Sequence, residues 1–147
     1  MPTCTFFGHS DCEVNIRDDL QRAINKLIKE ENVNKFYVGN NGFYDHLVIS
    51  VLDEIKLEND NIDFYVVLSK MPSIKNHFVI NNYETILPDG IEYIYPKFAI
   101  IYRNKWMINH SDFVVTYINR PQGGAARFYE YAIKRGKKVI NLGNYNL

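Results

Sequence analysis

The sequence has little of what marks several classes of protein. Its two cysteines, Cys4 and Cys12, are too few for a disulfide framework and stand in no metal-binding pattern. Eight glycines and five prolines in 147 residues are too few for a fibrous or low-complexity chain. The apolar runs are too short to cross a bilayer, and the start of the chain lacks the pattern of a signal peptide. We therefore expect a cytoplasmic domain with reduced thiols.

Neither sign of charge dominates. Lys+Arg and Asp+Glu each number 17, whereas proteins that bind nucleic-acid backbones concentrate positive charge. We expect neither a nucleic-acid nor a membrane partner, although a small anion held by backbone amides is compatible with zero net charge. The hydrophobic content of 46% is ordinary, and the length predicts a single domain over residues 1–147. The many Asn, Ile, Lys and Tyr residues indicate AT-rich coding DNA, of bacterial or phage origin.

Short apolar runs alternate with amphipathic segments along the chain. The runs predict strands, and the segments with helical spacing predict helices. This alternation predicts an α/β fold, a single Rossmann-like three-layer domain with a mainly parallel sheet and helices on both faces. The predicted strands are 3–8, 35–38, 63–68, 113–118 and 138–142, and the predicted helices are 12–31, one around 47–55, 97–110 and 126–135.

Two local patterns make sharper predictions. Ser10 and Glu13 have the spacing of a capping box, which would begin the first helix. Residues 69–95 form a long connection for a compact domain, and such connections usually carry structure of their own. Within it, Thr85–Leu87 and Ile91–Tyr95 are predicted to pair as a hairpin across a Pro-Asp-Gly turn.

Three polar or glycine-rich loops follow predicted strands. In an open parallel sheet the carboxyl ends of the strands share one edge, where ligands bind. Glycines and free helix amides at such an edge suit an anion. Taken alone, the first loop reads equally well as a turn, the second reads better as a turn, and the third is the strongest candidate. Three such loops at equivalent positions favour a ligand site. The candidate ligand-binding residues are Gly8, His9 and Ser10 in the first loop, Gly39, Asn40, Asn41 and Gly42 in the second, and Arg120, Gly123, Gly124 and Ala125 in the third.

Three charged residues are further candidates for the site. Arg103 lies among apolar neighbours, and Glu130 lies in the helix after the third loop. They either face one pocket, where they would hold a ribose and a phosphate, or form a surface ion pair. Asp45 is either a helix-start charge or a contact in the crevice.

Signatures of metal and cofactor chemistry are missing. The four histidines lack metal-ligand spacing, and no nucleophile elbow, Walker A motif or complete GxGxxG motif is present. The sequence therefore predicts no metal and no cofactor.

The loops resemble the SLOG superfamily, the Rossmann-like group named after the DNA-processing proteins and the LOG phosphoribohydrolases, and resemble most its compact bacterial branch. The resemblance covers essentially the whole chain. It rests on four segments, Phe6–Ser10, Gly39–Asp45, Arg103–Met107 ahead of Ser111-Asp112, and Gly123–Glu130.

The resemblance implies roles for particular residues. In LOG enzymes the residues matching Arg103 and Glu130 are the catalytic pair, and the turn matching Gly123–Arg127 binds phosphate. The sequence departs from that turn at Ala126, which replaces a glycine, and at Arg127, which replaces a threonine. Arg127 would supply a charged donor in place of the lost hydroxyl.

Two functions follow as hypotheses. The first is binding of a nucleotide or nucleotide-derived signal, such as an ADP-ribose-like species, by a sensor or sequestering protein, because the superfamily includes sensors in antiphage signalling. The second is a phosphoribohydrolase that cleaves the N-glycosidic bond of a nucleoside 5'-monophosphate. A DNA-processing scaffold is disfavoured by the balanced charge. The resemblance also implies a homodimer or a larger homo-oligomer.

Overall fold

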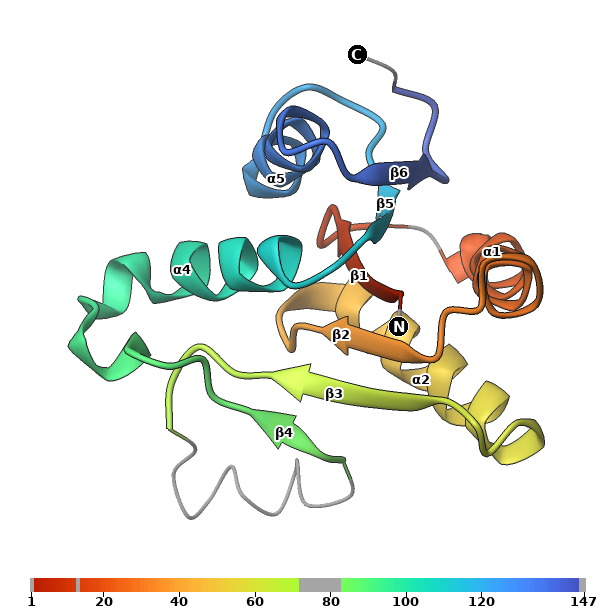
Figure 1. The fold of residues 1–147 in the computed structure, drawn as a ribbon. Coiled ribbons are helices and arrows are strands. Elements are labelled where there is room, and N and C mark those ends of the chain that lie inside the picture. The colour runs from red at the N-terminus through yellow and green to blue at the C-terminus, as the bar shows by residue number, and fades with distance from the viewer. Residues whose placement is uncertain (1, 13, 72–82, 146–147) are drawn as a thin grey trace.

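Strands and helices alternate along the chain in the computed structural model, which describes residues 2–12, 14–71 and 83–145 (Figure 1). The strands are β1 Thr3–Gly8, β2 Lys35–Val38, β3 Asp63–Val67, β4 Thr85–Ile86, β5 Phe113–Tyr117 and β6 Lys138–Asn141. The helices are α1 Arg17–Glu31, α2 Gly42–Glu58, α4 Pro96–Asn109 and α5 Gly124–Lys134, with short 3-10 turns η1 Val14–Ile16 and η2 Ile91–Tyr93.

The strands form one sheet in the order β4-β3-β2-β1-β5-β6, and every paired neighbour among the described residues is parallel. The central strands are apolar because both faces of a parallel sheet are covered. All five residues of β5 are buried, as are the four inner residues of β1. The predicted α/β fold with a parallel sheet is confirmed.

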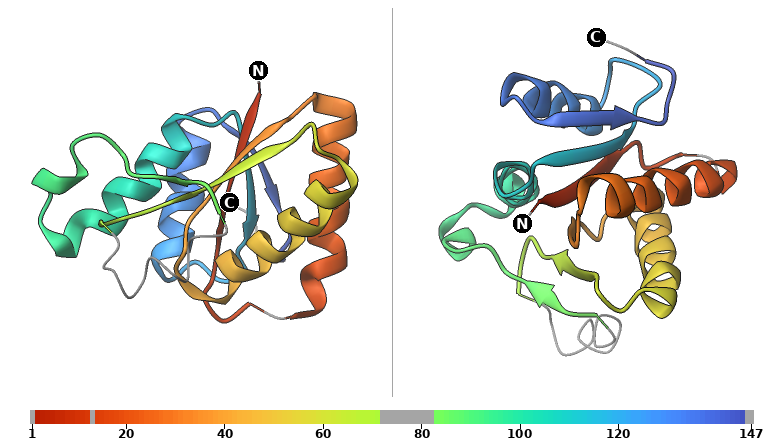
Figure 2. Two further views of the ribbon diagram at one scale, coloured as in Figure 1. Left: turned by 90° about the horizontal axis from the view of Figure 1, so that it is seen from below. Right: turned by 45° about the vertical axis from the view of Figure 1, so that its right-hand side comes forward.

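Helices cover the two faces of the sheet in pairs, α1 with α2 and α4 with α5 (Figures 1 and 2). Successive strand residues point to opposite faces, and β1 shows this directly. Phe6 packs in the core cluster that contains Leu52 of α2, whereas Phe7 stacks on Phe128 of α5, with ring centroids 5.5 Å apart. The predicted three layers are therefore present.

The predicted hairpin is wrong. Thr85 instead pairs in parallel with Val66 and extends the sheet as β4, while Ile91–Tyr93 forms η2. The chain must turn between these segments to begin α4 at Pro96, and Gly90 makes the turn with φ +83°. The Tyr102 hydroxyl of α4 donates to the Asp89 carbonyl at 2.6 Å, which ties the turn to the helix.

The predicted start of the first helix is also wrong. The helix α1 begins at Arg17, after η1, and Ile16 is its N-cap residue with no side-chain capping bond. Glu13 of the predicted capping box lies outside the described residues. No helix in the described part of the chain is long and apolar enough to span a membrane.

Candidate functional site

A cavity of about 270 Å³ lies beyond the carboxyl ends of β1 and β5. These two strands are neighbours in the sheet, but the chain continues from β1 to β2 on one side and from β5 to β6 on the other. Such a reversal of strand order opens a crevice, which is where α/β proteins bind ligands. We call this space the first cavity.

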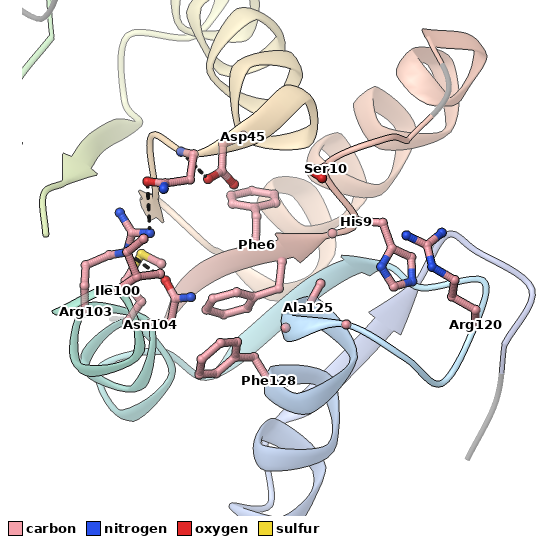
Figure 3. A pocket seen from close by; sticks show the side chains of 16 residues that line it. Phe6, His9, Ser10, Asp45, Ile100, Arg103, Asn104, Arg120, Ala125 and Phe128 are labelled. Atoms are coloured by element: carbon pink, nitrogen blue, oxygen red, sulfur yellow. Dashed lines mark hydrogen bonds between the residues drawn. The ribbon is translucent and has the colours of Figure 1, made fainter. Parts of the chain in front are cut away.

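Most of the predicted ligand residues line the first cavity (Figure 3). The predicted residues that line it are Gly8, His9, Ser10, Asn41, Asp45, Arg103, Arg120, Gly123, Gly124 and Ala125. Six further residues that were not predicted from the sequence also line it, Phe6, Phe7, Ile100, Asn104, Met107 and Phe128. The missed residues are mostly apolar, and nothing in the pattern separated them from the core.

Arg103 is the most unusual residue of the site, because its side chain is only 1% exposed. Its Nε donates to the Asn104 side chain at 2.7 Å, and its Nη1 donates to the Asn40 side chain and to the Val67 carbonyl, both at 3.1 Å. Its Nη2 donates to the Asn41 side chain at 3.4 Å. The guanidinium has five N–H groups, so one Nη2 hydrogen has no acceptor among the described residues.

All four acceptors of Arg103 are neutral, and no described carboxylate is within ion-pair distance. Burying an unpaired charge is costly, so this arrangement needs a reason. Burial lowers the pKa of Arg103, while the nearby Asp45 opposes that shift. The guanidinium stays protonated at neutral pH, so a buried positive charge with no direct ion pair among the described residues borders the first cavity, which Asp45 also lines.

Asp45 and Arg103 approach the same glycine. A Cβ atom added at Gly39 would lie 2.9 Å from Oδ2 of Asp45 and 3.2 Å from Cζ of Arg103. Oδ2 of Asp45 accepts a hydrogen bond from the Asn41 backbone N–H at 2.9 Å. Although part of the residue is exposed, enclosure of the carboxyl raises the pKa of Asp45 to about 6. Asp45 is thus a cavity residue, and it also lies at the start of α2.

The N-terminus of α5 borders the first cavity. No side chain caps this helix, and Gly123 precedes it with φ +98°. Gly124 is exposed, and a Cβ atom added there would meet nothing within 4 Å. Free amides and the helix dipole attract anions, so the cavity has a second electropositive element. The third loop thus lies at the cavity, and its binding of a phosphate stays a prediction.

His9 and Arg120 lie across the cavity from Arg103 and Asp45 (Figure 3). His9 is 3% exposed, and its Nε2 has no hydrogen-bond partner among the described residues. Burial, followed by the charge of Arg120, lowers the pKa of His9, so its imidazole is neutral at pH 7. Arg120 forms an ion pair with Asp11 at 3.1 Å.

Two of the predicted glycines, Gly8 and Gly42, are also needed for packing or backbone conformation. A Cβ atom at Gly8 would lie 2.4 Å from the ring of Tyr44, so Gly8 is required for that ring to pack. Tyr44 is 1% exposed, and its hydroxyl donates to the Val115 carbonyl at 2.9 Å. Gly42 has φ +82° and packs against Ser10. These contacts tie the first two loops together.

Five predicted site residues are not among the described residues that line the first cavity. Gly39 and Asn40 contact Arg103 instead, and Gly42 contacts Ser10. Arg127 is exposed on α5. These four surround the cavity without facing it. The fifth is Glu130.

Glu130 is not among the described residues that line the first cavity. The helix α5 begins at Gly124, two residues before the predicted start, and Phe128 lines the cavity. Glu130 follows two residues later, which is about 200° around a helix with 3.6 residues per turn. The residue is partly exposed. The pair of Arg103 and Glu130 that the resemblance implies stays a prediction.

Metal and thiol chemistry find no support in the described part of the chain. No group of three or more His, Cys, Asp or Glu residues there is placed to hold a metal ion. Cys4 and Cys12 are both buried and free, and burial raises the pKa of Cys12 to about 11. Both thiols are therefore unreactive.

Comparison with known proteins supports the fold. No protein-family model and no curated protein matches the chain. Among solved structures, the chain is similar to DNA processing protein A (DprA) from Streptococcus pneumoniae, with a TM-score of 0.71 and 16% sequence identity. The match covers 100% of this chain and 52% of that protein, so the chain spans about half of its length.

At that level of identity the likeness shows a shared fold and nothing of shared activity. It agrees with the Rossmann-like fold that the SLOG resemblance implied. A relationship to the LOG enzymes stays a prediction.

Proposed function

We propose that the chain binds a nucleotide or a nucleotide-derived anion, such as an ADP-ribose-like species, in the first cavity, as a sensor or sequestering protein. One observation carries the proposal. A buried guanidinium without a carboxylate partner and an uncapped helix N-terminus line the same cavity at the switch point of the sheet. Two positive elements, neither in direct contact with a described carboxylate, are suited to an anionic ligand, although the nearby charge of Asp45 offsets part of the charge of Arg103.

The ligand's phosphate would lie on the amides of Gly124 and Ala125. Gly124 offers an approach free of side chains, and backbone N–H groups at a helix start bind phosphate well. The remaining Nη2 hydrogen and the charge of Arg103 would act on the ribose-phosphate end. Asp45 accepts hydrogen bonds and would take a ribose hydroxyl.

A small anion fits better than a nucleic acid. The 17 basic residues are balanced by 17 acidic ones, and Arg120, at the cavity, already pairs with Asp11. Proteins that hold a polyanion by its backbone need several uncompensated cations. Binding of a labelled oligonucleotide at physiological salt, measured by fluorescence anisotropy, would overturn this choice.

The rival function, a phosphoribohydrolase, would use either Glu130, as the resemblance implies, or Asp45 as its carboxylate. Cleavage of an N-glycosidic bond needs a carboxylate at the reacting carbon, and Asp45 is the only carboxylate among the described residues that line the first cavity. A pKa of about 6 suits acid–base chemistry near neutral pH. We expect no free base from AMP, GMP, CMP or UMP. Release of base by the wild type, lost in Asp45→Asn, would establish the rival.

Self-association is part of the proposal. Tyr93, Tyr95 and Phe98 are 85%, 75% and 48% exposed around the start of α4. Neighbouring exposed aromatic residues favour an interface. We expect a homodimer or a larger homo-oligomer, and a monomer in light scattering at micromolar concentration would contradict this.

The test of function is native mass spectrometry of the protein purified from its own host. We expect a co-purifying mass that matches a nucleotide or an ADP-ribose-like compound. The same preparation of Gly124→Val should lack it. If wild type and variant carry the same mass, or the wild type carries none and no nucleotide raises its melting temperature, the proposal fails.

A further inference from the structure

A second cavity, of about 460 Å³, adjoins the first and was not predicted from the sequence. Its walls come from the loop after β2, the segment after β3, and the chain from β4 through η2 into α4. It falls within the range of about 300–1,000 Å³ that is usual for small-molecule sites. The first cavity alone is smaller than that range.

The two cavities share a wall. Asn41 and Ile100 line both of them. Figure 3 shows Ile100 on α4 beside Arg103, at the Arg103 side of the first cavity. A ligand that begins at α5 and passes Arg103 therefore reaches Asn41, and beyond Asn41 lies the second cavity. The spaces are two compartments of one site.

The asparagines at this boundary offer hydrogen-bond donors. A guanidinium only donates, so the side-chain atoms of Asn40 and Asn41 that face Arg103 are their oxygens. Each amide NH2 group then points elsewhere, and neither has an acceptor among the described residues. Both residues line the second cavity. The hydrogen bonds to Arg103 thus orient two free NH2 donors at the edge of the second cavity.

The remaining lining of the second cavity is mostly apolar, with a few polar and charged residues. Ile91 and Ala99 are 4% and 7% exposed, and Leu87 lies beside them. Lys70 and Glu92 are exposed at the edge. An apolar lining with a few directed polar groups suits a planar heteroaromatic ring, which buries its faces and keeps its edge hydrogen-bonded.

We infer that the second cavity receives the base of the nucleotide whose phosphate is bound in the first cavity. The NH2 groups of Asn40 and Asn41 donate to ring nitrogen or carbonyl acceptors of the base. This inference rests on the proposed function. It identifies the ligand as a complete nucleotide and not a sugar phosphate, and it assigns base selectivity to the wall between the cavities.

The test compares two kinds of probe by calorimetry. Ribose 5-phosphate reaches the first cavity only, whereas AMP, GMP, CMP and UMP reach both. We expect the tightest of these nucleotides to bind wild type at least tenfold more tightly than ribose 5-phosphate. Ala99→Phe, which fills the second cavity, should reduce nucleotide affinity about tenfold and change that of ribose 5-phosphate less than twofold.

Control variants keep the test decisive. Ile101→Phe adds an aromatic ring on the same helix at a site 41% exposed and outside the described lining of both cavities, and should bind both probes like wild type. Leu87→Trp fills the second cavity from another element if Ala99→Phe does not fold. Equal wild-type affinity for both probes, or unchanged nucleotide affinity in the folded filling variant, overturns the base site. If neither probe binds wild type, the proposed function itself fails.

Discussion

The two sides of the first cavity are built in opposite ways. On one side Arg103 is 1% exposed and held by three asparagine side chains and a backbone carbonyl. On the other side α5 begins at an exposed, uncapped glycine pair with nothing packed over Gly124. One side is part of the folded interior, and the other is open to the solvent.

This difference separates two ways of recognising an anion. The buried side fixes a charge in advance, so its position does not have to be organised when the ligand arrives. The open side supplies backbone donors that any phosphate can reach. A substitution on the buried side should therefore affect stability and binding together, whereas one on the open side should affect binding alone.

Replacing Arg103 should have the largest effect. Arg103→Met keeps the volume but leaves the Val67 carbonyl and the Asn104 oxygen without a donor. We expect a loss of about 1–3 kcal/mol in free energy of unfolding, measured in urea, and about 1.5–3 kcal/mol in nucleotide binding. Arg22→Met makes the same change at an exposed arginine of α1 outside the described lining of the cavity, and should leave nucleotide binding unchanged and stability within about 1 kcal/mol. If a folded Arg103→Met protein binds the nucleotide as tightly as wild type, the charge of Arg103 does not contribute to binding.

Gly124→Val should affect the open side alone. The added side chain meets nothing in the fold but blocks approach to the α5 amides. We expect nucleotide affinity to fall at least about tenfold, or about 1.4 kcal/mol, with the free energy of unfolding changed by less than about 1 kcal/mol. Gln122→Val, an exposed position in the same loop, is the control. Unchanged calorimetric affinity in Gly124→Val would contradict the phosphate assignment.

Asp45→Asn should make stability depend less on pH. The pKa of Asp45 is raised to about 6 from an ordinary 3.8, so the native state binds the extra proton between these values. Ionised Asp45 then costs stability above about pH 6, and this cost vanishes below about pH 4. We expect the variant to be stabilised by about 1–2 kcal/mol at pH 7 and by nothing at pH 3.5.

The control for that prediction is Asp53→Asn, at an exposed carboxylate of the same helix, whose melting temperature should stay close to that of wild type at both pH values. A stabilisation by Asp45→Asn of the same size at pH 3.5 and pH 7 would show that the buried carboxyl is not its cause.

Glu130→Gln should have the smallest effect. Glu130 is not among the described lining residues, so we expect nucleotide affinity within about twofold of wild type. A tenfold loss with unchanged stability would instead indicate that α5 turns Glu130 toward the ligand on binding, and that the expected pair with Arg103 forms only then.

The strands and the loops that follow them could be predicted because apolar runs and glycines are local signals. Gly8-His9-Ser10 and Gly123-Gly124 lie at the cavity where the parallel sheet places them. The surroundings of Arg103 could not be predicted, because they bring together residues 40, 41, 67 and 104 across the sheet. The apolar residues that line the cavity could not be predicted either, because in the sequence they look like residues of the hydrophobic core.

The predicted hairpin was wrong because a local pattern does not contain its tertiary context. Ile91–Tyr95 alternates like a strand, but the start of α4 at Pro96 and the bond from Tyr102 to Asp89 draw it into a turn. The role of Glu130 rests on its spacing in a motif and stays a prediction, because Phe128 and not Glu130 is among the described residues that line the cavity.

The most direct test of the account is an amide NMR titration of the wild-type protein with AMP and, separately, with adenosine. AMP should shift the backbone resonances of Gly124 and Ala125 and the Nε resonance of Arg103. Adenosine, which lacks the phosphate, should leave the Gly124 and Ala125 resonances in place. Shifts at Gly124 and Ala125 that are equal for both compounds, or shifts with AMP confined to residues outside the first cavity, would contradict the claim that this cavity binds a phosphate.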